Sequence, residues 1–209
     1  MQIVNFIKDS TIECSPFNWG LTLFSYGCNF HCAMCQGYNY EKVTNKGNII
    51  GEAKNIILEN ITPLHDCVVF LGGEPTIWGN SLKETLQLCH DEGLYTKIFS
   101  NGYNCELIEE INNEKLCDAW SIDFKGLNNL QEEIGLPGKE YFRCFEATIK
   151  SINKYELPLE IRTTFYDGNE NDRDRIINFV QENYIKKKKK AYPELFTKYI
   201  IQEDARALI

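Results

Sequence analysis

Long apolar runs and an excess of positive charge are both missing from this 209-residue sequence. No segment approaches the roughly 20 consecutive apolar residues that a membrane-spanning helix requires. The first nine residues alternate apolar and polar and lack a basic flank with an apolar core, so we expect no signal peptide. The 22 Lys and Arg against 30 Asp and Glu give a formal charge of −8, which argues against a non-specific nucleic-acid binder. We therefore expect a cytoplasmic protein that binds neither nucleic acid nor membrane.

Cysteine is the unusual part of the composition, with nine residues. An odd number excludes a framework in which every cysteine is paired within the chain. In a reducing cytosol, cysteines serve more often as ligands, nucleophiles or small core residues than as disulfides. Six of the nine form no close group. Among these we expect Cys67, Cys89 and Cys144 to be buried as small apolar residues, because they fall on apolar positions of predicted elements.

Strand and helix patterns alternate along the chain. Residues 67–71 form a short continuous apolar run, typical of a strand covered on both faces. Strands that alternate with helices imply parallel pairing through crossover helices. Periodicity alone leaves both a partial barrel and an open doubly wound sheet possible. The expected strands are 1–9, 19–26, 67–71, 95–100, 119–124, 159–165 and 198–202, and the expected helices lie around 56–61, 81–92, 107–111, 142–152 and 176–184.

Two local patterns carry predictions of their own. Ser81 and Glu84 have the spacing of a capping box at a helix start, and Gly93 stands where that helix should stop. Residues 186–190 are five consecutive lysines, which we interpret as a solvated turn or helix end. Contact of this run with an acidic partner is the alternative.

The sharpest motif directly follows the strand expected at 19–26. Cys28, Cys32 and Cys35 form a C-x3-C-x2-C pattern, and thiolates this close in one loop can converge on a soft metal centre. Three thiolates can hold a four-iron cluster with one iron left open, whereas a structural zinc site needs a fourth ligand. A cluster, a zinc site and a chance grouping of core cysteines all remain open on spacing alone. The fourth zinc ligand could be His31, His65 or Cys67.

A second motif ends the strand expected at 67–71. The sequence there is Gly72-Gly73-Glu74-Pro75. Paired glycines at a strand end let the backbone approach a ligand closely. The Glu74 carboxylate could bind an ammonium group, and Pro75 fixes the turn. Taken alone, this motif also suits a tight loop with an exposed acid.

Together the two motifs resemble the radical S-adenosylmethionine (radical SAM) superfamily. The resemblance implies a partial (β/α)6 TIM-like barrel, which matches the six expected strands that follow the short N-terminal one and decides between the two architectures. It also implies a [4Fe–4S] cluster and S-adenosylmethionine (SAM) as cofactors. By this resemblance Cys28, Cys32 and Cys35 bind the cluster, and Gly72, Gly73 and Glu74 line the methionine end of SAM.

Weaker motifs follow in the same order along the chain. Ser100-Asn101-Gly102 resembles a Thr-Asn-Gly loop, Asp123-Phe124-Lys125 an Asp-x-Lys segment of glycyl radical enzyme activases, and Arg162-Thr163-Thr164 a strand of some anaerobic ribonucleotide reductase activases. The alternatives without a binding role are an ion pair at the solvent edge for the Asp-x-Lys segment and a surface position on a strand for Arg162. The resemblance places Ser100, Asn101, Asp123, Lys125 and Arg162 around the ribose and carboxylate of SAM, where such groups form charge-assisted hydrogen bonds.

One position departs from the pattern of many superfamily members. They carry an aromatic residue before the third cysteine, close to the adenine, and His-Asn after it. Here Met34 precedes the third cysteine and Gln36-Gly37 follow it. A flexible, polarisable methionine can still contact adenine, so Met34 is kept as a cofactor-binding residue. The departure bears on the subfamily.

The resemblance also implies a reaction and partners. A reduced cluster cleaves SAM to methionine and a 5′-deoxyadenosyl radical, which abstracts a hydrogen atom. The expected role is a glycyl radical enzyme activase, most similar to those of anaerobic ribonucleotide reductase, with flavodoxin or ferredoxin as electron donor. The alternatives are a small-molecule enzyme such as 7-carboxy-7-deazaguanine synthase, or a non-redox zinc module. We expect one domain over 1–209, with a core over 2–184 and an extension, 185–209, that closes or flanks the barrel.

Overall fold

The predicted strands assemble into a single sheet. The computed structural model describes residues 1–11, 13–32, 35, 43–127, 134–135, 137–166 and 169–203. Within them, the strand order is β3-β1-β2-β4-β5-β6-β7-β8. Neighbours from β2 to β8 are parallel, whereas β1 pairs antiparallel with β2 and β3. The strands are β1 (Gln2–Ser10), β2 (Gly20–Ser25), β3 (Gly51–Glu52), β4 (Cys67–Gly72), β5 (Tyr95–Ser100), β6 (Ala119–Asp123), β7 (Leu159–Phe165) and β8 (Thr197–Glu203).

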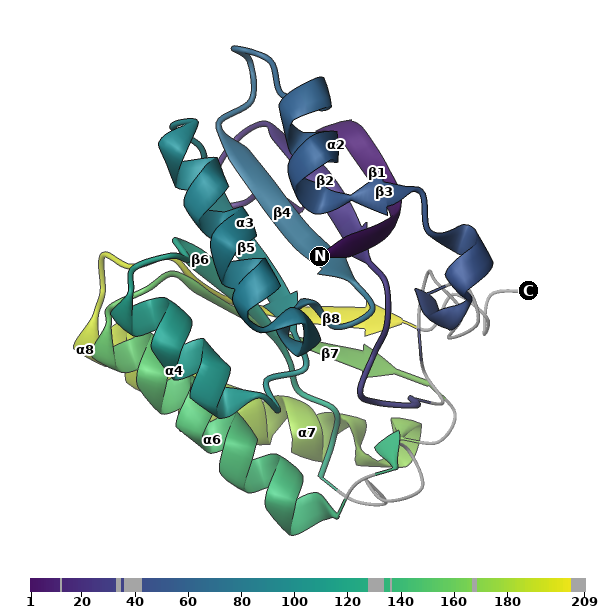
Figure 1. Ribbon diagram of the computed structural model, residues 1–209. Helices are drawn as coiled ribbons and strands as arrows, with labels where there is room; N and C mark the ends of the chain where they lie inside the picture. Colours follow the sequence, from purple (N-terminus) through teal and green to yellow (C-terminus); the bar gives the residue numbers. More distant parts are fainter. Residues whose placement is uncertain are drawn as a thin grey trace.

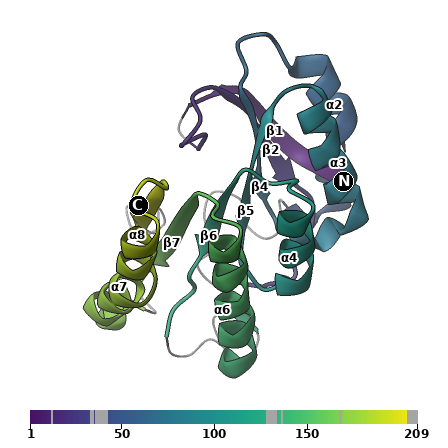
Figure 2. The same cartoon turned by 90° about the vertical axis from the view of Figure 1, so that its left-hand side faces the viewer.

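Helices connect the parallel strands and lie along one side of the curved sheet (Figure 1, Figure 2). The two end strands, β3 and β8, do not pair with each other, so the sheet does not close and the barrel is open. The predicted partial (β/α)6 barrel is confirmed. None of the described helices has the length and apolarity needed to cross a membrane. The helices are α2 (Ala53–Asn60), α3 (Asn80–Asp91), α4 (Cys105–Asn113), α6 (Gly138–Lys154) and α7 (Arg173–Val180), which continues through a π-helical turn, Gln181–Ile185, into α8 (Lys186–Ala191).

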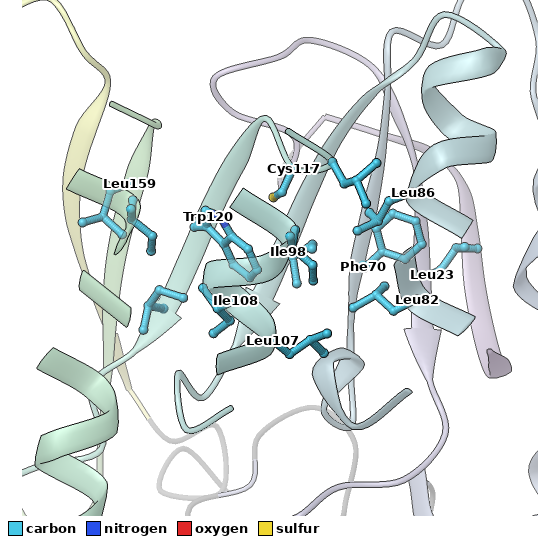
Figure 3. Close-up of a cluster of buried hydrophobic side chains, with 14 of the residues drawn as sticks. Leu23, Phe70, Leu82, Leu86, Ile98, Leu107, Ile108, Cys117, Trp120 and Leu159 are labelled. Carbon is cyan, nitrogen blue, oxygen red and sulfur yellow. The ribbon is translucent and has the colours of Figure 1, made fainter. Parts of the chain in front are cut away.

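The main core lies between the strands and the helices (Figure 3). One row of side chains crosses the sheet in direct register and faces the helices, each almost completely buried. The indole N–H of Trp120 in this row donates to Asn112 Oδ1 at 2.7 Å, so its polar atom is satisfied. The row is Leu23, Phe70, Ile98, Trp120 and Leu159, and it meets Leu82 and Leu86 of α3 and Leu107 and Ile108 of α4.

The capping-box prediction is wrong. Helix α3 begins at Asn80 after Gly79, and no side chain caps its first turn. The Ser81 hydroxyl accepts a hydrogen bond from the N-terminal amine of Met1, while Glu84 pairs with Lys54 at 2.8 Å. The Met1 amine and Lys54, both distant in the sequence, therefore bind the two side chains of the predicted capping box. The helix does stop before Gly93, as predicted.

The lysine run forms α8 and is only partly solvated. Four of its residues are exposed, but Lys188 is 2% exposed, and its Nζ donates to Asn153 Oδ1 at 2.9 Å. Burial lowers the pKa of Lys188 to about 8, against a smaller opposing effect of Glu156. The predicted solvated helix end holds for four of the lysines and is wrong for Lys188, because a helix with a period of 3.6 residues turns one lysine towards α6.

Cysteine burial agrees with the prediction. Cys67, Cys89 and Cys144 are at most 4% exposed, and Cys14 and Cys117 are buried as well. Residues beyond 184 contribute α8 and then β8, which pairs in parallel with β7 at one edge of the sheet.

Candidate functional site

A cavity of about 360 Å³ opens where the parallel strands end. Barrels of alternating strands and helices carry their active sites at this end, because the loops after the strands converge there. Every predicted site residue that the structure describes lines this cavity, whereas Met34 lies outside the described residues. The predicted lining residues are Cys28, Cys32, Cys35, Gly72, Gly73, Glu74, Ser100, Asn101, Asp123, Lys125 and Arg162. Sequence reasoning missed Glu13, Phe30, Val43, Leu71, Phe99 and Gln202.

The thiol loop leaves β2 through a glycine. Gly27 has a φ of 85°, a left-handed conformation that other residues adopt only with strain. Its N–H donates to the Val43 carbonyl at 2.6 Å, and its carbonyl accepts the Glu74 N–H at 2.8 Å. Burial, with a smaller effect of the Glu74 charge, raises the pKa of Cys28 to about 12. Burial also raises the pKa of Cys32. A bound metal centre must therefore promote loss of these protons, because only thiolates are ligands.

The two glycines after β4 hold the second loop against the first. A Cβ on Gly73 would lie 1.9 Å from the Gly27 carbonyl oxygen, and one on Gly72 would lie 2.6 Å from the Ser25 nitrogen. The Gly73 N–H donates to the Ser25 carbonyl at 3.0 Å. A side chain at either position would push the two loops apart. Glycine is needed here because two backbone segments of the chain approach each other closely, whereas the sequence predicted a close approach of the backbone to a ligand.

The Glu74 carboxylate is buried, with the residue 1% exposed, and four hydrogen bonds hold it. Its Oε1 accepts from the Thr76 N–H at 3.1 Å, the Thr76 hydroxyl at 2.7 Å and the Ser100 hydroxyl at 2.9 Å. Its Oε2 accepts from the Asn101 N–H at 2.7 Å. Burial raises the pKa of Glu74, while these donors oppose the rise. The carboxylate thus ties the loops after β4 and β5 together, a role that the sequence did not indicate.

An ion pair forms the wall at the end of β6. Lys125 Nζ lies 2.8 Å from Asp123 Oδ2, and the Lys125 side chain is only 15% exposed. Burial alone lowers the pKa of Lys125, but the Asp123 carboxylate, helped by Cys32, raises it overall. Lys125 therefore carries its positive charge beside the thiol loop. Both residues of the pair line the cavity, with the Asp123 side chain 39% exposed.

Arg162 of β7 is buried, at 7% exposed, so the alternative of a surface strand position is wrong. Its Nη1 lies 2.6 Å from Glu13 Oε2, and its guanidinium carbon lies 4.9 Å from the centre of the Phe99 ring. Its Nε is buried with no hydrogen-bond partner among the described residues. Because an unsatisfied buried donor costs about 1–3 kcal/mol, this N–H suits an acceptor on a ligand in the cavity.

The residues proposed as a fourth zinc ligand do not all lie at the cavity. The His65 ring contacts the Lys8 carbonyl at 2.7 Å and Thr62, and Cys67 begins β4, at the opposite end of that strand from the thiol loop. Within the described part of the chain, no three Cys, His, Asp or Glu side chains form a group that could hold one metal ion. The three thiols of the motif line the same cavity, and thiolates are the ligands that iron–sulfur clusters use.

The family and its relatives agree with the motifs. The model of the radical SAM superfamily matches residues 22–180. Two proteins of Methanocaldococcus jannaschii, named as candidate glycyl-radical enzyme activating enzymes, are 29% identical over 167 residues and 31% identical over 147 residues. The alignments cover 78% and 68% of this chain, and 68% and 54% of those relatives. A 7-carboxy-7-deazaguanine synthase of the same organism is 28% identical over 149 residues, covering 65% of this chain and 58% of that enzyme.

Solved structures support the fold. Native anSMEcpe with bound AdoMet matches with a TM-score of 0.57 at 18% identity, covering 85% of this chain and 49% of that one. TYW1 with a lysine-pyruvate adduct bound matches with a TM-score of 0.51 at 21% identity, covering 78% of this chain and 59% of that one. This chain therefore spans about half the length of the first of these proteins. At such identities the likeness shows a shared fold.

Proposed function

This chain belongs to the radical SAM superfamily, and we propose that it cleaves SAM reductively at a [4Fe–4S] cluster. The observation that carries the proposal is the meeting of three thiols, the glycine loop and the paired basic side chains in one cavity. These groups come from the ends of different strands, and no other described cavity brings them together. A metal centre, a cofactor backbone and an anionic group could all be bound there at once.

The three thiols supply the metal site. Cys28, Cys32 and Cys35 would each bind one iron, which leaves the fourth iron open to a ligand. A bound, reduced cluster supplies one electron to the sulfonium of SAM, which yields methionine and a 5′-deoxyadenosyl radical. Phe30, which lies between two of these cysteines in the sequence, is 2% exposed and packs against Tyr103 and Tyr141, so it anchors the thiol loop in the core.

The other wall residues would bind and orient the organic cofactor. Lys125 and the free Nε edge of Arg162 suit the methionine carboxylate, because both are positively charged donors. The half-exposed carboxylate of Asp123 suits ribose hydroxyls. Gly72 and Gly73 line the cavity, so their backbone groups could bind the methionyl amino group.

The substrate we propose is a glycine of a partner protein. Two relatives are named as candidate glycyl-radical enzyme activating enzymes, and the Asp-x-Lys and Arg-Thr-Thr segments both contribute to the cavity wall. We name an anaerobic ribonucleotide reductase as the target and a flavodoxin or ferredoxin as the electron donor. A second candidate is small-molecule radical chemistry, favoured by the likeness to a 7-carboxy-7-deazaguanine synthase.

The cluster is tested by anaerobic reconstitution of the chain. We expect about four irons and four sulfides per chain and 5′-deoxyadenosine after addition of dithionite and SAM. Cys32→Ala should abolish 5′-deoxyadenosine formation, whereas Cys105→Ala, a similarly half-buried cysteine that does not line the cavity, should retain it. Stoichiometric zinc without sulfide, or product formation by Cys32→Ala, would contradict the proposal.

The substrate is tested separately. The reconstituted chain is incubated with SAM, a reductant and the anaerobic ribonucleotide reductase of the same organism, and electron paramagnetic resonance is recorded. A glycyl doublet on the reductase supports the activase role. A chain that cleaves SAM but gives no doublet would favour the small-molecule candidate.

A further inference from the structure

The connection between β1 and β2 fills the side of the sheet that faces away from the helices. We call residues 13–19 the plug segment. Cys14 is fully buried there, where it packs against Cys67 and Val69 of β4, and its thiol donates to the Ser10 carbonyl at 3.1 Å. The Ser15 carbonyl accepts a hydrogen bond from Lys97 Nζ at 2.6 Å. These contacts fix the plug segment to β4 and β5, and with it the residue at its start.

Glu13 begins the plug segment and reaches the cavity. Its carboxylate lies 2.6 Å from Arg162 Nη1, across 149 positions of sequence. The Glu13 side chain is 30% exposed and that of Arg162 is 8% exposed, so water screens the pair only in part. Glu13 therefore neutralises the guanidinium from one side through Nη1, while the buried Nε has no hydrogen-bond partner among the described residues.

The charges on the described wall of the cavity follow one pattern. The basic side chains are Lys125 and Arg162, and each forms an ion pair with its own carboxylate, Asp123 or Glu13. Glu74 is a further acid on this wall. No described basic group of the wall lacks a carboxylate partner. Such a wall disfavours ligands with an excess of negative charge and favours a ligand that brings a positive charge.

We propose that Glu13 is a specificity-determining residue of the cavity, which makes binding sensitive to the positive charge on the sulfur of the ligand. This inference rests on the proposed function, because SAM carries that charge as a sulfonium. The thioether S-adenosylhomocysteine has nearly the same shape and lacks it. Loss of one carboxylate charge from a partly buried wall of the ligand cavity should change the preference between the two ligands roughly 3- to 10-fold.

The test measures the two affinities side by side. The anaerobically reconstituted chain is dialysed to equilibrium against SAM and against S-adenosylhomocysteine. Glu13→Gln keeps an acceptor for Arg162 but removes the charge, so the ratio of SAM to S-adenosylhomocysteine affinity should fall roughly 3- to 10-fold. Glu13→Asp should keep the ratio of the unaltered chain. Glu84→Gln removes a carboxylate from an exposed ion pair with Lys54 and should change neither affinity.

Several outcomes would overturn the inference. Equal losses of affinity for SAM and S-adenosylhomocysteine would show that Glu13 only supports the plug segment. An unchanged ratio of the two affinities would show that the charge of Glu13 does not affect the preference between the ligands. Thermal unfolding verifies that Glu13→Gln is folded, and Glu13→Ala, which should lower the ratio likewise, replaces it if it is not. If the unaltered, cluster-loaded chain binds neither ligand, the proposed function itself fails. A chain that binds both ligands but shows no change of ratio in the variants overturns this inference alone.

Discussion

The Glu74 carboxylate accepts the backbone N–H of Asn101 at 2.7 Å and so joins the loops that follow two neighbouring strands. The Ser100 hydroxyl adds a second bond to the same carboxylate at 2.9 Å. The two glycines before Glu74 allow the backbone of the β4 loop to pack directly against the thiol loop. Three loops that line one cavity are thereby held in fixed relative positions, which is the preorganisation that a cofactor site needs.

Replacement of the carboxylate should loosen this arrangement. Glu74→Gln places an NH2 group among N–H and hydroxyl donors, so at least one buried donor loses its acceptor. We expect a loss of about 1–3 kcal/mol in the free energy of unfolding, measured by urea titration. Glu92→Gln, an exposed change at the end of α3, should stay close to the unaltered chain. Equal stability of Glu74→Gln and the unaltered chain would contradict the role of Glu74 as a buried acceptor.

The close approach of two loops gives a second prediction. Gly73→Ala puts a methyl group 1.9 Å from the Gly27 carbonyl oxygen, and neither backbone segment can move aside at low energetic cost. We expect a loss of about 1–3 kcal/mol in unfolding free energy and weaker SAM binding to the reconstituted chain. Gly51→Ala is the matched control, because its Cβ would meet Ile56 at an ordinary 3.5 Å. Cofactor affinity that survives Gly73→Ala unchanged would speak against a binding role of this loop.

The burial of Lys188 predicts that the free energy of unfolding depends on pH. Burial lowers its pKa in the folded chain to about 8, from 10.5. Between these two values the unfolded chain binds more protons, so the free energy of unfolding rises with pH across this window. Below pH 8 the cost of a buried charge is present in full. Lys188→Met removes it, so its stability advantage over the unaltered chain should shrink by about 2 kcal/mol between pH 7.5 and 10.

The control for this prediction is the neighbouring lysine. Lys189 is exposed, so Lys189→Met should follow the unaltered chain at every pH. Urea titrations at matched pH values give the comparison, and tyrosine and cysteine titrations cancel because all variants share them. Parallel curves for Lys188→Met and the unaltered chain would show that Lys188 keeps an ordinary pKa.

Much of the site could be predicted because its motifs sit at strand ends. Apolar runs mark strands such as Cys67–Gly72, and the loop after each strand follows at once in the sequence. Parallel strands then bring those loops to one edge of the sheet, whatever the details of packing. The thiols, the glycine loop and Asp123 are therefore found together, as the motifs indicate. Their roles in binding remain predictions.

Other features depended on contacts that no local pattern encodes. Glu13 lies in a short connection without a motif, and the packing of this connection against β4 and β5 brings it to Arg162. The Ser81 and Glu84 pair has the right spacing for a cap, yet the amine of Met1 takes the serine. The spacing of a helix cap is a local preference worth about 1 kcal/mol, which tertiary partners override.

The sequence by itself determined the alternation of strands and helices, the thiol and glycine motifs, and hence the barrel and its family. These follow from neighbouring residues, whose periodicity and spacing act within a few positions of the chain. Only the tertiary structure decided which partners the charged groups find: Glu13 pairs with Arg162, the Glu74 carboxylate accepts from the β5 loop, and Lys188 donates to Asn153. Such pairs depend on how the sheet curves and how its helices pack, because burial and distance, rather than order in the chain, set their energies.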